Sequence, residues 1–427
     1  MKINKILEFM KKKEVLDKII SVIIFLLPFS IYFYDRLFKN ILFPMLIVIA
    51  ILKILKNGFK YSFYEKYFVA LIFIIIVSIV FQNYFEDLTY CRRLKYILRW
   101  SLLPVLVGQL SLNEKHFRIG IAGYFLSFIF VLNKSFQATI NFFFNSTSQK
   151  INYLEIFKTE NLKTIENFND TFRLRGLFPT ITENAIMLGI PLIFTYCILL
   201  DKKIKYKFKI LVVPFFILSF YFTIVTQARG MYLALIVTLL SSFAIKIFFS
   251  NNIKKNIIKL SSALLVLFLI IFITPKSNKY KEKLYSITKG DVARMVVYKE
   301  SLNLFKNNPL TGIGYGNFPQ AENSIKNDFF YWGSYKHEHN MGLKMLVETG
   351  IGGFLIYYMM MGAIIYNLIK KRELLISRVT VGTISIFMIY ESFETIVIYN
   401  KPNVYLFFLI ALAINPFYKK IKNTHDV

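Results

Sequence analysis

Long apolar stretches recur along the whole chain and constrain its fold more than any other feature of the sequence. A helix needs about 20 apolar residues to cross the roughly 30 Å hydrocarbon core of a bilayer. Stretches that approach this length occupy residues 16–35, 37–56, 67–83, 96–112, 118–135, 184–200, 208–227, 230–249, 257–274, 341–369, 379–399 and 402–418. The sequence therefore predicts an all-α polytopic membrane protein with about 12 transmembrane helices.

The basic residues indicate how these helices are oriented. The net charge of +28 would suggest nucleic acid in a soluble protein, but here the lysines concentrate in alternate loops. They gather in residues 1–18, 200–209, 370–378 and 418–427. The positive-inside rule makes these segments and both termini cytoplasmic, and we expect no nucleic-acid partner. A basic group formed by Arg92, Arg93 and Lys95 falls on the predicted outer side, against the rule.

The chain is expected to form one membrane domain over residues 1–427, with a first long external loop at 136–183 and a larger, partly helical one at 275–340. The first apolar stretch is too long for the core of a signal peptide, so it is interpreted as a membrane anchor. Cys91 and Cys197 are the two cysteines, and Cys197 falls inside a predicted span. A disulfide framework is therefore not expected.

The larger external loop contains an amphipathic helix followed by a glycine-rich turn. Asp291 is the predicted N-cap, and Asn-Asn-Pro at 307–309 ends the helical pattern. Such a helix would lie on the membrane surface and bring Arg294 over the ends of the spans. Gly314 and Gly316 in the following GIGYG segment permit positive φ. Either their backbone approaches a ligand or the chain simply turns back towards the membrane, and the sequence leaves both open.

Two arginine motifs lie beside predicted spans. Arg229, in TQARGMYLAL, sits at the outer membrane face with no acidic residue within four positions on either side. An unpaired guanidinium is costly at that depth, so an anionic ligand and snorkelling to lipid headgroups are equally good interpretations. Arg173 and Arg175, in RLRGLF, precede the sixth span and are interpreted from this stretch alone as solvated loop charges.

The segment HEHN places two of the four histidines, His337 and His339, at the outer end of the tenth predicted span. The span begins after Asn340, so the imidazole of His339 is expected near the depth of Arg229. Taken alone, His339 is better explained as a hydrogen-bonded interfacial histidine than as a catalytic group.

Inside the same span, Lys344 and Glu348 are four residues apart, a spacing that predicts a structural salt bridge on one helix face. Gly350, Gly352 and Gly353 follow and predict a flat patch against which another helix packs closely.

Arginines and an imidazole at the outer face suit transfer of a glycan from a lipid pyrophosphate. Arginines bind phosphate oxygens bidentately and stabilise the charge that develops on the leaving group. A neutral imidazole can take the proton of an attacking hydroxyl. The chain has no Asp-x-Asp motif, and Glu86-Asp87 is its only adjacent acidic pair. These observations favour a mechanism without a metal, with Glu86 and Asp87 as the reserve ligands.

Three motifs together resemble the O-antigen ligase and O-antigen polymerase superfamily. His339-Asn340 followed by LVETGIGG is similar to its histidine motif, and TQARGMYLAL to its arginine at the start of a span. Arg294 followed by NNPLTGIGYGNF resembles its arginine helix and Pro-x-x-Gly-x-Gly-x-Gly-x-Phe stretch. The resemblance is most specific from about 215 to 360.

The resemblance implies a GT-C-like glycosyltransferase of the bacterial inner membrane that uses an undecaprenyl-pyrophosphate-linked glycan without metal or other cofactor. Arg229 and Arg294 would bind the donor pyrophosphate, as would Arg175 on weaker grounds, and His339 would activate the acceptor. His337 is an additional histidine and a competing candidate, although the motif asparagine follows His339. The supporting positions are expected to be His337, Asn340, Glu348, Gly314 and Gly316.

The acceptor is not fixed by the resemblance. A ligase transfers the glycan to lipid A-core, a polymerase to another lipid-linked repeat, and a related branch to protein hydroxyls. The ligase is favoured because the dominant external loop precedes the histidine span. A polysaccharide flippase is an alternative of another class, but no inverted repeat is visible and the unusual residues cluster at the outer face instead of the midplane.

Overall fold

In the computed structural model, all regular secondary structure among the described residues is helical. The structure describes residues 13–33, 37–60, 62–81, 97–98, 100–110, 112–147, 180–226, 228–248, 280–318, 337–395 and 400–414. No strand occurs among these residues. Six of their helices are long and apolar enough to cross a bilayer, which agrees with a polytopic membrane protein. The total of 12 spans and the GT-C-like arrangement stay predictions.

The helices that correspond to predicted spans begin and end as follows. They are α2 (Lys13–Phe33), α4 (Phe43–Asn57, preceded by a π-helical turn at Phe38–Leu42), α5 (Phe63–Val80), α7 (Leu103–Gln109), α8 (Glu114–Thr147), α9 (Ile181–Leu200), α10 (Tyr206–Val225), α11 (Arg229–Phe248), α15 (Met341–Lys370), α16 (Leu375–Tyr390) and α17 (Asn400–Ile414). The predicted span at 257–274 lies outside the described residues.

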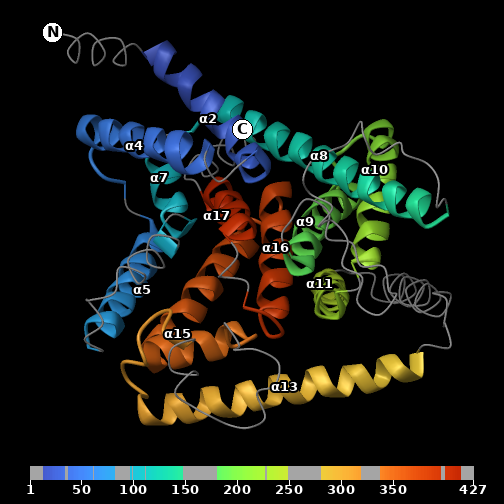
Figure 1. The fold of residues 1–427 in the computed structure, drawn as a ribbon. Coiled ribbons are helices and arrows are strands. Elements are labelled where there is room, and N and C mark those ends of the chain that lie inside the picture. The colour runs from blue at the N-terminus through green and yellow to red at the C-terminus, as the bar shows by residue number, and fades with distance from the viewer. Residues whose placement is uncertain are drawn as a thin grey trace.

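The centre of the bundle is α17, whose residues 402–414 are all buried. Aromatic side chains hold it to its neighbours: the rings of Trp100 and Phe407 lie 4.5 Å apart, and the Tyr124 hydroxyl donates to the Tyr405 carbonyl oxygen at 2.6 Å. Burial of large aromatic side chains is among the strongest packing contributions a helix can make. Figure 1 shows α17 and α16 in the middle of the molecule, with the other helices around them.

Helix α8 extends further than the sequence indicated. It continues to Thr147, past residue 136, where the first external loop was expected to begin. The sequence from Tyr124 to Thr147 contains no glycine or proline, so nothing in it breaks the helix. The predicted span at 118–135 covers only the apolar part of this helix, and the helix continues into the more polar sequence that follows.

Helix α13 (Tyr280–Asn307) lies across one end of the bundle (Figure 1). Its predicted end at Asn307 is confirmed. Its predicted start was wrong, because the helix runs through Asp291 and begins at Tyr280. Aspartate is compatible with an exposed helical position as well as a cap, so the residue type alone could not decide between them.

Helix α15 is broken at Gly350, which has φ +69° and ψ −174°, and Figure 1 shows two segments that meet at an angle. The loop after α13 closes over the break. The Ile313 amide donates to the Val347 carbonyl oxygen at 2.8 Å, and the Ile351 amide donates to that of Pro309 at 2.9 Å. These bonds replace helical hydrogen bonds that the break removes. A Cβ at Gly350 would lie 2.1 Å from the Leu310 carbonyl oxygen, so only glycine fits.

The predicted close packing at the other two glycines is confirmed. A Cβ placed on Gly352 or Gly353 would lie 3.5 Å from the Ile74 side chain of α5. Gly350 therefore allows the break. The distance of 3.5 Å to Ile74 is an ordinary van der Waals contact, and the tighter restriction at Gly353 comes from its own helix, where a Cβ would lie 1.9 Å from Thr349 Oγ1.

Candidate active site

The segment from His337 to Asn340 leads into α15 and is held on two sides. His339 has φ +52°, a left-handed conformation that is uncommon outside glycine and costs free energy unless its surroundings impose it. On one side, the Tyr298 hydroxyl of α13 donates to the His339 carbonyl oxygen at 3.3 Å. Asn340 is the N-cap of α15 and its side-chain oxygen accepts from the Leu343 amide at 3.0 Å. The backbone thereby fixes where the His339 ring points.

The second support is the turn at residues 391–394 after α16. The Met341 amide donates to the Glu391 carbonyl oxygen at 2.8 Å, and the Asn340 side-chain amide donates to that of Ser392 at 3.1 Å. The sequence predicted a span through this region to residue 399, but α16 ends at Tyr390. The turn thus connects the C-terminal end of α16 directly to the histidine segment.

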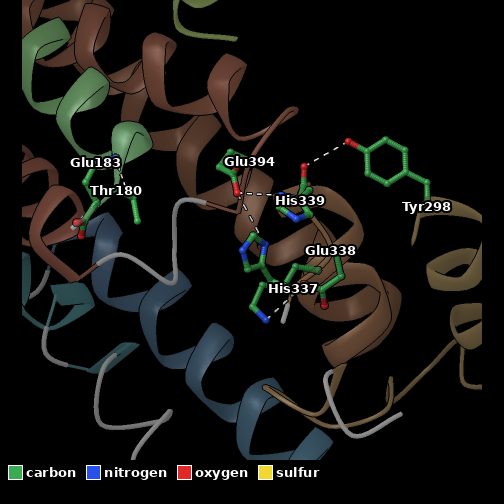
Figure 2. Close-up of polar contacts among 8 residues, drawn as sticks. Thr180, Glu183, Tyr298, His337, Glu338, His339 and Glu394 are labelled. Atoms are coloured by element: carbon green, nitrogen blue, oxygen red, sulfur yellow. Dashed lines mark hydrogen bonds and ion pairs between the residues drawn. The ribbon is translucent and has the colours of Figure 1, made fainter. Parts of the chain in front are cut away.

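Both histidines face the carboxylate of Glu394. The Nδ1 atom of His339 lies 3.1 Å from Glu394 Oε1, a hydrogen bond, whereas Nδ1 of His337 lies 3.8 Å from the same oxygen. The two imidazole rings are 4.1 Å apart. Figure 2 shows both rings directed at Glu394, with Tyr298 reaching the His339 backbone from the other side. The side chains of His339 and Glu394 are 22% and 11% exposed, so a substrate can reach the cluster.

The electrostatic environment separates the two histidines. Burial, together with the neighbouring charge of His339, lowers the pKa of His337 to about 4, so His337 is neutral at neutral pH. Burial acts to raise the pKa of Glu394, but the hydrogen bond with His339 and the positive charges at His339 and Arg294 outweigh it and hold that pKa below its usual value. Glu394 is therefore an ionised acceptor.

Beneath the histidines lies a fully buried charged triad formed by Glu338, Lys344 and Glu348. The predicted Lys344–Glu348 salt bridge is confirmed, with Nζ and Oε2 2.5 Å apart. Glu338 joins it with Oε2 3.7 Å from the same Nζ, a contact that no sequence spacing indicated. Both carboxylates have no exposed side-chain surface, and the Lys344 ammonium also lies 5.2 Å from the Tyr315 ring centre. Glu348 therefore has a structural place below the cluster.

The helices that carry the predicted arginines meet this cluster. Arg229 is the first residue of α11, and a Cβ on the next residue, Gly230, would lie 2.8 Å from the Tyr390 ring and 3.2 Å from Phe393. The start of α11 thus touches the turn that bears Glu394. Arg294 lies one turn before Tyr298 on α13, and its charge acts on both His337 and Glu394. Arg175, Arg92, Arg93, Glu86 and Asp87 are outside the described residues.

The glycine-rich loop packs against the broken helix. Gly314 and Gly316 have φ of +91° and +88°, as the sequence predicted. Both are buried, and the amide of the residue before Gly314, Ile313, donates to the Val347 carbonyl oxygen of α15. This geometry supports the second of the two interpretations, a turn that returns the chain to the helical bundle.

Glu394 is the main component of the cluster that the sequence did not predict. It was placed inside an apolar span, where its carboxylate had no assigned role. The available signal was the presence of two acids, Glu391 and Glu394, within one apolar stretch, because ionisable residues at membrane depth are expensive and usually functional.

The donor atoms of His337, His339 and Glu394 lie within 4.8 Å of one another, a grouping that a divalent cation can use. The 3.1 Å between Nδ1 of His339 and Oε1 of Glu394 suits a shared proton as well as a shared cation, because two ligands of a tetrahedral Zn²⁺ lie about 3.3 Å apart. The neighbouring positive charges of Arg294 and Lys344, which both act on His337, disfavour a cation.

Comparison with known proteins identifies the relationship. No curated protein matches the chain. Residues 214–358 match the family model described as O-antigen ligase. The matched region contains Arg229, Arg294 and His339, and ends within α15. Over this segment, the chain is similar to the O-antigen ligase family.

Proposed function

We propose that the protein is an O-antigen ligase that transfers a glycan from undecaprenyl pyrophosphate to lipid A-core without a metal ion. The match to the O-antigen ligase family model supports a lipid-linked glycan transferase of the ligase or polymerase type. The donor, the acceptor, the metal independence and the residue roles are the parts proposed here.

One observation supports the proposal: the three segments that carry the motifs meet around His339. Residues 390–394 contact His339 through Glu394 and contact the start of α11, next to Arg229, through Tyr390 and Phe393. Helix α13 reaches the same place, because Tyr298 bonds to the His339 backbone one turn after Arg294. A lipid pyrophosphate bound between α11 and α13 would present its anomeric carbon near His339.

In the proposed reaction, Arg229 and Arg294 hold the pyrophosphate oxygens, with Arg175 as a third contributor. Guanidinium groups suit this task because they form paired, charge-assisted hydrogen bonds with phosphate. His339 removes the proton of the acceptor hydroxyl as its oxygen attacks the anomeric carbon. The bond from that carbon to the pyrophosphate oxygen breaks, and the arginines stabilise the developing charge.

The proposed location is the bacterial inner membrane, with both termini cytoplasmic and the site facing the periplasm. The support is the basic composition of residues 200–209 and 370–378, which follow α9 and α15 at the opposite end of those helices from the His339 cluster. Lipid A-core is proposed as the acceptor because the longest predicted external loop directly precedes the histidine segment.

The test is a transfer assay in EDTA with purified full-length protein, undecaprenyl-pyrophosphate glycan and lipid A-core. Wild type should place glycan on lipid A, and the His339→Ala variant should not. Glycan chains that lengthen on the lipid carrier, with none on lipid A, would identify a polymerase instead. Movement of donor across a vesicle membrane without any transfer would identify a flippase and overturn the proposal.

A further inference from the structure

We propose that Glu394 is the positioning residue of His339: it accepts the Nδ1 proton, fixes the tautomer in which Nε2 is the base, and stabilises the imidazolium formed during transfer. This inference rests on the proposed function, because it assigns His339 the part of the general base. It adds a residue from outside the segment that matches the family model, which ends at residue 358.

The geometry selects one partner and one atom. Glu394 Oε1 is 3.1 Å from Nδ1 of His339 and 3.8 Å from Nδ1 of His337, so only His339 is within hydrogen-bond distance. The turn that carries Glu394 is fixed to the histidine segment by two further bonds, from Met341 to Glu391 and from Asn340 to Ser392. Carboxylate and imidazole are therefore held in register by backbone contacts on both sides.

The tautomer follows from the charge of the carboxylate. An ionised carboxylate can only accept hydrogen bonds, so the proton between the two residues belongs to Nδ1 of His339. The surroundings keep the pKa of Glu394 low despite its burial, which maintains this state at neutral pH. A neutral imidazole with a proton on Nδ1 has its lone pair on Nε2. Glu394 thus determines which nitrogen can act as the base.

The same contact contributes during the reaction. The acceptor O–H proton moves to Nε2 while the acceptor oxygen forms its bond to the anomeric carbon, and the pyrophosphate leaves with the electron pair of the broken C–O bond. His339 then carries a positive charge, which the ionised Glu394 stabilises at 3.1 Å. The imidazolium returns its proton to solvent or to the released pyrophosphate. Carboxylate–histidine pairs act this way in other transferases and hydrolases.

His337 does not serve as a second base in this arrangement. Its ring lies 4.1 Å from that of His339, and a second positive charge there would oppose protonation of the base. Its buried, neutral state avoids this repulsion. We infer that His337 fills the space beside the pair and excludes water from one side of Glu394.

The kinetic test compares Glu394→Gln and Glu394→Asp with wild type in the transfer assay in EDTA. Glutamine keeps the size but loses the charge, and should lower kcat by about 10²- to 10⁴-fold, the usual contribution of general-base catalysis, while KM for the donor stays the same. Aspartate keeps the charge on a shorter side chain and should recover part of kcat. Glu373→Gln, at an exposed position between α15 and α16, is the matched control and should behave as wild type.

A spectroscopic readout separates positioning from mere stability. The chain has four histidines, so ¹⁵N-histidine labelling of the full-length protein gives few signals, which the His339→Ala and His337→Ala variants assign. Wild type should show His339 protonated on Nδ1 and unprotonated on Nε2 at neutral pH. The Glu394→Gln variant should lose this single tautomer even where its thermal stability equals that of wild type.

The outcomes distinguish the two proposals. If His339→Ala retains transfer, the proposed function of His339 fails and the positioning role fails with it. An inactive His339→Ala beside an unimpaired Glu394→Gln, or a wild-type His339 protonated on Nε2, would overturn the positioning role alone. Loss of wild-type transfer in EDTA with recovery on adding Zn²⁺ would show instead that His337, His339 and Glu394 hold a metal.

Discussion

Two clusters that contain glutamates lie side by side at the start of α15, and they shift the pKa of a glutamate in opposite directions. In the outer cluster, Glu394 is ionised and shares its charge with the accessible His339. In the inner cluster, burial and the neighbouring Glu348 raise the pKa of Glu338 to about 8, against the opposing influence of Lys344. The outer carboxylate is placed to stabilise a new positive charge, whereas the two inner carboxylates already face the one lysine that they share.

The difference shows how charge accessibility separates chemistry from structure. Lys344 has two carboxylates for one ammonium, and with all three groups buried the inner cluster is balanced only if one carboxylate keeps its proton. Glu394 instead lies where an imidazole, a solvent path and the charge of Arg294 keep it ionised. We therefore assign the chemistry to the outer cluster, which a substrate can reach. The inner cluster is assigned the structural role of supporting the histidine segment.

The largest effect is expected from the outer cluster. His339→Ala should reduce transfer by at least about 10²-fold, because it removes the general base. His337→Ala should cause a much smaller loss, because its imidazole lies beyond hydrogen-bond distance of Glu394. The transfer assay measures both losses. Both variants should accumulate as wild type does and should melt at the same temperature in scanning fluorimetry of purified protein. Equal losses in the two variants would contradict the assignment of distinct roles.

Lys344→Met should produce the largest loss of stability. It leaves two buried carboxylates without a cation, and breaking a buried pair in this way costs about 3–5 kcal/mol. Adding Glu338→Gln and Glu348→Gln to the same protein should restore most of the melting temperature, because the uncompensated charge is gone. Lys370→Met, at the exposed end of α15, is the control and should change it little. A stable Lys344→Met single variant would show that the inner cluster is not a structural unit.

The Arg229→Lys variant tests the proposed binding of the donor pyrophosphate by Arg229. A lysine keeps the charge but cannot form the paired hydrogen bonds, so kcat/KM should fall by about 10- to 100-fold, the equivalent of about 1.5–3 kcal/mol for hydrogen bonds to a charged group. Arg118→Lys is the control, because Arg118 is exposed and pairs with Glu114 at the other end of the bundle. Unchanged kinetics for Arg229→Lys would remove its assigned role.

The smallest effect is a pH dependence of the inner cluster. The folded-state pKa of Glu338, about 8, lies above its usual value of 4.5, so the folded protein binds the extra proton more tightly than the unfolded chain does. The resulting stability is fully present below about pH 4.5 and is lost as the pH rises through 8. Melting temperatures should fall between pH 6 and about 9 in wild type and less steeply in Glu338→Gln. Parallel pH curves for the two proteins would contradict the protonated state.

Features of the site that depend on residues close together in the sequence could be predicted, whereas features that depend on distant residues could not. The Lys344–Glu348 pair, the positive φ of Gly314 and Gly316, and the end of α13 at Asn307 follow from spacing and residue type within a few positions. Glu394 could not be assigned in this way, because its partner is 55 residues away and only packing brings them together.

Some predicted helix ends were wrong for a similar reason. A uniformly apolar stretch reveals that a helix exists but not where it ends, so α16 was predicted to continue to residue 399 although it ends at Tyr390. The ends are decided by which carbonyl and amide groups find partners in neighbouring segments, as the Glu391 carbonyl oxygen does with the Met341 amide.

The sequence by itself determined that this is a helical membrane protein, because runs of apolar residues have few other stable environments, and that it carries the motifs of the O-antigen ligase superfamily. Only the tertiary structure decided which apolar helix faces its surroundings and which forms the core. Helix α10 is largely exposed while α17 is buried throughout, although both are apolar on all sides. It also placed Glu394 beside His339. An apolar side chain is stabilised by burial against any apolar neighbour, whereas a hydrogen bond at 3.1 Å requires two particular segments to meet.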